Sequence, residues 1–337
     1  MKPERLLRLV TQFPARSVAV VGDLILDHYV WGSASRISPE APVPIVLVNR
    51  ETVVPGGAAN VARNALSLGA KVRAFGVVGR DENGGRLRGM LRQAGAEVAG
   101  VLTAADRTTT VKTRVLAGTQ QVVRVDRETA EPISSRLQAR LLDALAGSVR
   151  RGELDAIVLE DYAKGVVSRG LVAEVCQLAN DHHVPVAMDP HPSHPYNVKG
   201  LRLMTPNRSE AFALAGVYQH PARGPVLGDR DLMAVGDRLK ELWGVELLLI
   251  TLGADGMALF ADGKPPVHIP TRAREVFDVS GAGDTVIASF VLAIAAGAAP
   301  EEAAHLANHA AGIVVGKVGT ASVTPDELRE ELKRHHG

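Results

Sequence analysis

Residues 278–285 (DVSGAGDT) bring together groups that can perform chemistry on a phosphate. The small residues Gly281, Ala282 and Gly283 precede an apolar pattern typical of a helix, so backbone N–H groups at a helix start are open to close approach. These donors and the positive end of the helix dipole suit an anion. The carboxylate of Asp284 lies in the same turn, and an anion site beside a base is what phosphoryl transfer to a hydroxyl needs. Taken alone, the stretch is explained equally well as a glycine-rich turn capped by Asp284.

The elements that must position this stretch alternate between strand and helix. Residues 17–26 (SVAVVGDLIL) predict one buried strand, ending near the carboxylates of Asp23 and Asp27, where open α/β sheets bind ligands. Further strand patterns cover residues 71–79, 156–159, 184–188, 201–204, 247–252, 257–260 and 267–270, and helix patterns cover residues 81–94, 134–148, 300–315 and 325–334. We therefore expect one α/β domain over residues 1–337, with a mostly parallel central sheet and helices on both faces.

Two segments break this alternation. Residues 29–48 are rich in proline and strand-forming residues, and residues 108–126 alternate as a hairpin that turns at Gly118. They predict a small β-sheet lid on the α/β body. A polar row on the second segment either faces a cleft or is a solvated strand face, and for any one member the solvated face is the favoured interpretation; the row is Lys112, Arg114 and Arg124.

Composition narrows the class of protein. The 337 residues carry 38 basic and 37 acidic side chains, so charge gives no reason to expect nucleic acid or a membrane surface as a partner. The single cysteine, Cys176, excludes a disulfide within the chain and fits a reducing compartment. The longest apolar run, residues 286–299, is too short to span a bilayer and predicts a buried helix. We expect a cytoplasmic protein.

Four motifs, in this order, resemble the signatures of the PfkB/ribokinase family of sugar kinases, and the resemblance covers nearly the whole chain. They are residues 56–60 (GGAAN), 207–210 (NRSE), 251–256 (TLGADG) and 278–284 (DVSGAGD). A P-loop, the other common phosphate motif, is absent from the sequence. The resemblance implies a ribokinase-like fold and an ATP-dependent phosphotransferase that uses Mg²⁺.

The same resemblance implies roles for individual residues. Asp284 is the implied catalytic base, with the N–H groups of Gly281, Ala282 and Gly283 as the anion hole. The implied sugar-binding residues are Asp27, Asp23, Gly56, Gly57 and Asn60. The implied nucleotide-binding residues are Asn207, Arg208, Ser209, Glu210, Thr251, Gly253, Gly256 and Asn308, with Glu210 acting on Mg²⁺ through water. Asp278 and Ser280 stand where relatives help to bind a monovalent cation, which implies a K⁺ site.

Further segments resemble the kinases of D-glycero-β-D-manno-heptose 7-phosphate: residues 35–44 (SRISPEAPVP), 161–165 (DYAKG) and 316–320 (GKVGT). This implies phosphorylation of the sugar O1 on the way to ADP-heptose, by the stand-alone kinase form, as a homodimer joined through the lid. The implied cations for the sugar phosphate are Lys164, Arg114 and Arg36. His191 stands where close relatives tend to have Lys, and Ser280 where Thr is usual. The alternatives are another sugar or nucleoside kinase of this fold, and an inactive scaffold.

Overall fold

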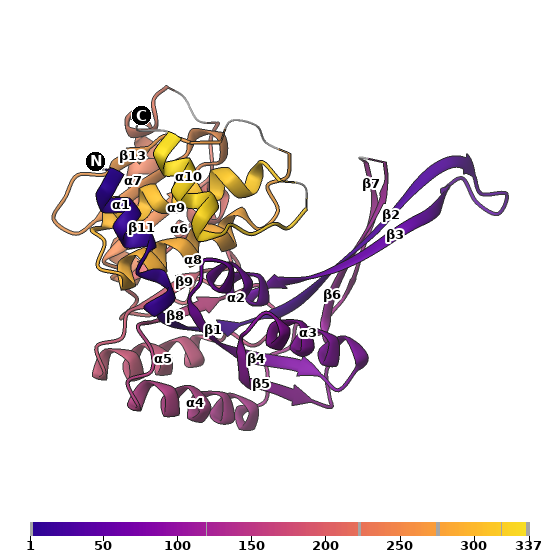
Figure 1. Cartoon of the computed structure of the whole chain (residues 1–337), viewed down its shortest axis with the longest axis horizontal. Helices are drawn as coiled ribbons and strands as arrows, with labels where there is room; N and C mark the ends of the chain where they lie inside the picture. Colours follow the sequence, from indigo (N-terminus) through magenta and orange to yellow (C-terminus); the bar gives the residue numbers. More distant parts are fainter. Residues whose placement is uncertain (1–2, 119, 222–223, 274–276, 318, 335–337) are drawn as a thin grey trace.

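The computed structural model describes residues 3–118, 120–221, 224–273, 277–317 and 319–334. Thr119 and Val318, which belong to segments discussed above, lie outside these residues. Across the described residues the body is built on a nine-stranded sheet, parallel from β11 to β5 and antiparallel at β12 and β13 (Figure 1). In spatial order its strands are β13 (Val267–Ile269), β12 (Met257–Ala261), β11 (Leu247–Thr251), β10 (Leu203–Met204), β9 (Val186–Asp189), β8 (Ala156–Glu160), β1 (Ser17–Gly22), β4 (Lys71–Gly79) and β5 (Glu97–Ala104).

Helices cover both faces of this sheet. Alternate residues of β1 point to opposite sides: Val18 and Val20 pack in one hydrophobic cluster, Ala19 and Val21 in the other. The first cluster holds α1 (Pro3–Val10), α2 (Ala58–Ser67), α3 (Glu82–Gln93), α8 (Ala282–Ala295), α9 (Pro300–Val315) and α10 (Pro325–Arg334). The second holds α4 (Ser135–Arg150), α5 (Arg169–Asp181), α6 (Arg208–Ala215) and α7 (Arg230–Trp243). Short 3-10 turns are η1 (Phe13–Ala15), η2 (Val226–Gly228) and η3 (Gly253–Asp255). The predicted mostly parallel sheet with two helical layers is confirmed.

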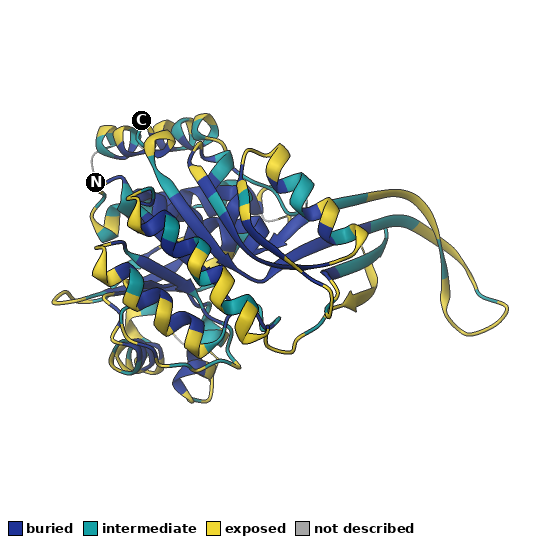
Figure 2. Ribbon diagram, turned by 90° about the horizontal axis from the view of Figure 1, so that it is seen from below, coloured by how far each residue is buried: buried dark blue, intermediate teal, exposed yellow. Residues whose placement is uncertain are grey.

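A second, smaller sheet projects from the body as two adjoining hairpins (Figure 1). Its order is β3 (Pro44–Gly57), β2 (Leu24–Ile37), β6 (Thr110–Ala117) and β7 (Gln120–Arg127), with β2 and β6 parallel. We call residues 24–57 and 110–127 the arm. Its outer end is exposed, whereas its base is buried against the body (Figure 2). The predicted lid of strand segments therefore exists, and it is longer than expected.

Four features of the fold differ from the sequence prediction. The run 17–26 is not one strand, because β1 ends at Gly22 and β2 begins at Leu24 in the other sheet. The helix α1 and the edge strand β5 were not predicted. Nor was α7, whose interior Gly236 weakens the helix signal. A Cβ at Gly236 would lie 2.2 Å from Cε1 of Phe260, so packing between α7 and β12 requires the glycine.

The long apolar segment after residue 282 forms α8, and ten of its fourteen residues are buried in the core. This confirms the prediction of a buried helix. No helix within the described ranges has the length and apolar character needed to traverse a bilayer.

Candidate active site

Asp284 lies in the first turn of α8, at the centre of a hydrogen-bonded group. Its Oδ1 accepts a hydrogen bond from the Tyr162 hydroxyl at 3.0 Å, and its Oδ2 accepts one from Nδ2 of Asn60. Gly281, the N-cap, has φ of +77°, and a Cβ there would lie 2.6 Å from Asn60 Nδ2. A side chain at position 281 is thus excluded by backbone conformation and by space.

The environment of Asp284 tunes it as a base. Burial raises the pKa of its carboxyl to about 6, and the hydrogen bonds from Asn60 and Tyr162 oppose that rise. Asp284 is therefore a carboxylate at neutral pH, and a stronger base than an ordinary aspartate. A general base works best with a pKa near the operating pH.

Asn60 occupies a different place from the one that the family resemblance implied. Its side chain is fully buried, and its amide contacts Asp284, so in this structure it positions the carboxylate. A chain of hydrogen bonds supports it: the Thr285 hydroxyl donates to Asn64 Oδ1 at 2.9 Å, and Asn64 Nδ2 donates to the Asn60 carbonyl at 2.9 Å. The sequence analysis missed the roles of Asn64, Thr285 and Tyr162, although Tyr162 lay in a segment that it singled out.

Asp23, expected to bind a sugar hydroxyl, is instead a structural residue. Its side chain is 1% exposed. One carboxylate oxygen accepts the backbone N–H groups of Tyr162 and Lys164, both at 2.9 Å, and the other accepts that of Val166 at 3.1 Å. With three backbone donors satisfied, Asp23 fixes the loop after β8 and has little capacity left for a ligand.

Asp27, predicted to bind a sugar hydroxyl, lies between Arg114 and Gly56. Its Oδ1 accepts a hydrogen bond from Arg114 Nη1 at 2.6 Å, and the Arg114 guanidinium lies 5.3 Å from the ring centroid of Tyr29. Gly56 packs directly on this carboxylate, because a Cβ at position 56 would lie 2.2 Å from Asp27 Oδ2. The first glycine motif therefore makes room for a carboxylate rather than only opening a helix.

The cations expected to hold a sugar phosphate are not gathered together. Lys164 is near the site, with its Nζ 2.8 Å from Glu128 Oε1. Arg36 lies nine residues beyond Asp27 on β2, roughly 30 Å away at the rise of a strand, and it is exposed. Within one chain, Arg36 does not reach Asp284.

A cluster of carboxylates lies beside Asp284. Glu160 ends β8, Asp189 ends β9, and the register pairs these two residues. Carboxylate oxygens of Glu160, Asp189 and Asp284 lie within 4.8 Å of one another. Glu160 is buried, its Oε2 has no hydrogen-bond partner among the described residues, and burial followed by the charge of Asp189 raises its pKa well above the usual range. An orphaned carboxylate oxygen among other carboxylates fits a hard divalent cation such as Mg²⁺. The sequence analysis named neither Glu160 nor Asp189 as a ligand.

The residues of the NRSE motif begin α6. Asn207 Oδ1 accepts the Glu210 N–H at 3.0 Å, and Glu210 Oε2 accepts the Asn207 N–H at 2.8 Å, which is a capping box. The Ser209 hydroxyl also donates to Asn207 Oδ1, at 2.7 Å. Arg208 binds Asp229 at 2.6 Å, so its side chain joins α6 to α7. Of this motif, Glu210 keeps one carboxylate oxygen for another ligand.

The predicted nucleotide residues outside that motif do come together. A cavity of about 530 Å³ lies between η3, α8 and α9. The residues that line it include Asn308 and members of the motifs at 251–256 and 278–284, namely Thr251, Gly253, Gly256, Ala282 and Gly283. Asn308 Nδ2 donates to the Pro270 carbonyl at 2.6 Å. The largely apolar wall ends at the anion stretch of α8, which suits a flat base with a phosphate tail.

Asp278 joins the anion stretch to the segment after α9. Its Oδ1 accepts the Ser280 N–H at 2.9 Å, and its Oδ2 accepts the Gly319 N–H at 3.2 Å. The Ala282 N–H donates to the Val279 carbonyl at 3.2 Å. Ala282 is therefore a weaker anion donor than the family resemblance implied.

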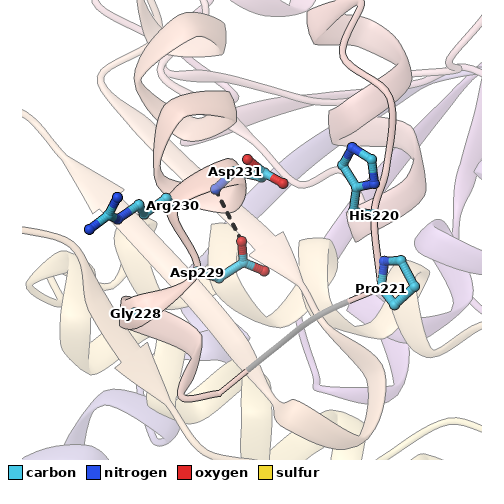
Figure 3. Close-up of a pocket in the computed structure, with 6 residues that line it drawn as sticks. All are labelled: His220, Pro221, Gly228, Asp229, Arg230 and Asp231. Atoms are coloured by element: carbon cyan, nitrogen blue, oxygen red, sulfur yellow. Dashed lines mark hydrogen bonds between the residues drawn. The ribbon is translucent and has the colours of Figure 1, made fainter.

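A second cavity, of about 400 Å³, lies at the start of α7 (Figure 3). It is lined by His220, Pro221, Gly228, Asp229, Arg230 and Asp231. Asp229 caps α7 by accepting the N–H of Asp231 at 3.1 Å. None of the predicted catalytic or sugar-binding residues lines this cavity, so we place the chemistry at Asp284.

Comparison with known proteins agrees with this geometry. The profile of the pfkB family carbohydrate kinases matches residues 15–327. The bifunctional protein HldE of Geobacter sulfurreducens is 45% identical over 323 residues, which cover 96% of this chain and 64% of that protein. The chain spans less than two thirds of the length of such curated relatives.

Solved structures show the same fold. Arabidopsis thaliana ribokinase complexed with ribose and ATP superposes with a TM-score of 0.74 at 21% identity, covering 94% of this chain and 98% of that one. Phosphofructokinase-2 from Escherichia coli in complex with potassium gives 0.74 at 17% identity, covering 95% and 98%.

Proposed function

This chain belongs to the pfkB family of carbohydrate kinases, and from that premise we propose that it transfers the γ-phosphoryl group of ATP to the O1 hydroxyl of D-glycero-β-D-manno-heptose 7-phosphate. The product would be the 1,7-bisphosphate, used to make ADP-heptose for the lipopolysaccharide core. The observation that carries the proposal is the position of Asp284, whose buried carboxylate directly follows two residues that line the nucleotide-sized cavity, Ala282 and Gly283, and is near enough to Asp27 for that charge to raise its pKa. The choice of sugar rests on the resemblance of the arm and of residues 161–165 to heptose 7-phosphate kinases.

The chain's own residues divide the work. Asp284 accepts the proton of the attacking hydroxyl, and general bases of this kind contribute about 10²–10⁴-fold. The N–H groups of Gly281, the N-cap of α8, and of Gly283, in its first turn, stabilise charge on the transferred phosphoryl group, which is the larger contribution. Asp27 orients the sugar by accepting hydrogen bonds from its hydroxyls, and Arg114 holds Asp27 in place.

The carboxylate cluster is the proposed place for Mg²⁺. Glu160 and Asp189 would hold the ion, and Glu210 would act through water, since Mg²⁺ sheds its water shell reluctantly. When bound, the ion neutralises charge on the phosphates of ATP. Asp278 and Ser280 are the proposed place for K⁺. We also propose a homodimer through the arm, whose outer strand exposes Val123 and Val125.

A substrate panel tests the proposal. Purified protein is incubated with Mg-ATP and heptose 7-phosphate, fructose 6-phosphate, fructose 1-phosphate, ribose or adenosine, and ADP release is measured. Turnover with heptose 7-phosphate alone, giving an anomeric phosphate by phosphorus NMR, is the expected result. The control is Asp284→Asn, which should lower turnover by about 10²–10⁴-fold with ATP binding intact. Turnover with another acceptor would mean that the proposed sugar substrate is wrong. No turnover with any acceptor of the panel would favour an inactive scaffold.

A further inference from the structure

Lys112 and Lys164 form a pair of largely buried cations at the base of the arm. Lys112 lies on β6 and Lys164 in the loop after β8, and each side chain is only 16% exposed. Their counter-ions are Asp126, 4.0 Å from Lys112, and Glu128, 2.8 Å from Lys164. Burial and then the charge of Lys164 lower the pKa of Lys112. The register of β6 and β7 pairs Lys112 with Asp126, and the partner of Lys164, Glu128, follows only two residues later, so the two ammonium groups lie near each other. A shared anion would relieve their repulsion.

The pair lies beside the groups assigned to the sugar. The parallel register of β2 and β6 pairs Asp27 with Lys112, which places both side chains on one face of adjacent strands. Lys164 is two residues beyond Tyr162, whose hydroxyl contacts Asp284. A sugar held at one end by Asp284 and along its length by Asp27 would present its other end to these lysines.

The backbone around Lys164 is fixed in advance. The carboxylate of Asp23 accepts hydrogen bonds from three backbone N–H groups of this loop, those of Tyr162, Lys164 and Val166. Arg107 donates to the carbonyls of Lys164 at 2.5 Å and of Thr129 at 2.8 Å, which ties this loop to the segment that carries Glu128. Little ordering of the backbone remains to be done when a ligand binds, and preorganisation of this kind increases affinity.

We infer that Lys112 and Lys164 together bind the phosphate group that the sugar already carries, and that Asp126 and Glu128 are counter-ions which this phosphate displaces. The inference rests on the proposed function and adds Lys112, for which the sequence favoured a solvated strand face. The carboxylate side chains are more exposed than the lysines, at 24% for Asp126 and 28% for Glu128, and Asp126 also pairs with Arg124 at 2.9 Å. Both carboxylates therefore keep water or a second cation as a partner when the phosphate takes their lysines. A sugar without a phosphate leaves both ion pairs as they are and gains nothing from them.

Two substitutions with opposite effects test the inference. Lys112→Met should weaken binding of heptose 7-phosphate by about 10- to 100-fold, the contribution of a charge-assisted hydrogen bond, and leave binding of unphosphorylated heptose unchanged. Glu128→Gln removes the competing carboxylate and should tighten binding of the phosphorylated sugar by up to about fivefold, since exposed pairs are weak. The matched control is Lys240→Met, because Lys240, on α7, is 18% exposed and paired with Asp262, which directly follows β12.

Binding is measured by calorimetry without nucleotide, which separates this inference from the proposed reaction. Equal weakening of both sugars by Lys112→Met, or no weakening of either, overturns the inference. If Lys112→Met does not fold, Glu128→Gln decides, and unchanged or weaker binding of heptose 7-phosphate overturns it. If no sugar is phosphorylated but the selective loss of binding appears, the phosphate site stands and the proposed reaction fails.

Discussion

Replacing Gly56 with alanine should damage sugar binding without touching the nucleotide cavity. The new methyl would lie 2.2 Å from Asp27 Oδ2 and 2.9 Å from its Cγ. An ordinary contact is 3.4 Å or more, so the carboxylate oxygen must retreat by about 1.2 Å. A movement of this size is larger than the spread of ordinary hydrogen-bond distances, so it would break the 2.6 Å contact between Asp27 and Arg114.

A misplacement of about 1 Å in a positioning group costs about 10²-fold in rate. We therefore expect kcat/KM for the sugar to fall by about 100-fold in Gly56→Ala, with KM for ATP unchanged. The assay is steady-state ADP release with each substrate varied in turn. The control is Gly89→Ala in α3, where no atom lies within 4 Å of the added Cβ. It should keep full activity and gain about 1 kcal/mol of stability, as alanine does in a helix interior.

A double-mutant cycle identifies the route of the effect. In an Asp27→Ala background the methyl at position 56 has no carboxylate to displace, so the double variant should match Asp27→Ala alone. If Gly56→Ala keeps the sugar kcat/KM of the wild type in a folded protein, Asp27 does not orient the sugar. If its cost is the same with and without Asp27, the methyl acts through the backbone of β3.

Two further predictions concern protons and stability. Because burial raises the pKa of Asp284 to about 6, the base is protonated below that pH, and kcat/KM should fall about tenfold per unit under pH 6. Tyr162→Phe removes a donor to the carboxylate and should move this limb of the profile to higher pH; an unmoved limb would contradict the role of Tyr162. Asp81→Ala should lower the free energy of unfolding by about 0.5–2 kcal/mol in urea melts and leave kinetics unchanged. Burial raises the pKa of Asp81, but hydrogen bonds from Thr109 and Gly84 outweigh it and lower the pKa. This stabilisation is therefore fully present above the ordinary pKa of 3.8 and is lost as the pH falls through the lowered pKa of the folded protein, so an Asp81→Ala deficit that does not shrink as the pH is lowered below 3.8 would refute the reasoning.

Local spacing was enough to predict the parts of the molecule that depend on neighbours in the chain. The backbone of α8 and the capping box at Asn207 complete their hydrogen bonds within about one helical turn. The alternation of strand and helix likewise fixed the fold class, because periodicity is a property of each element by itself. The buried helix after residue 282 and the fold class were predicted and agree with the structure.

Contacts between distant residues decided the rest. Tyr162 and Asn60 approach Asp284 across 122 and 224 residues of chain, and the register of β8 with β9 pairs Glu160 with Asp189. The interpretation of Asp23 changed for the same reason. The role of a carboxylate or an ammonium group depends on the atoms that surround it. Spacing in the sequence does not indicate which loop will donate three N–H groups to Asp23. Burial, hydrogen bonding and charge at these residues are properties of the folded packing, which is why only the tertiary structure could supply them.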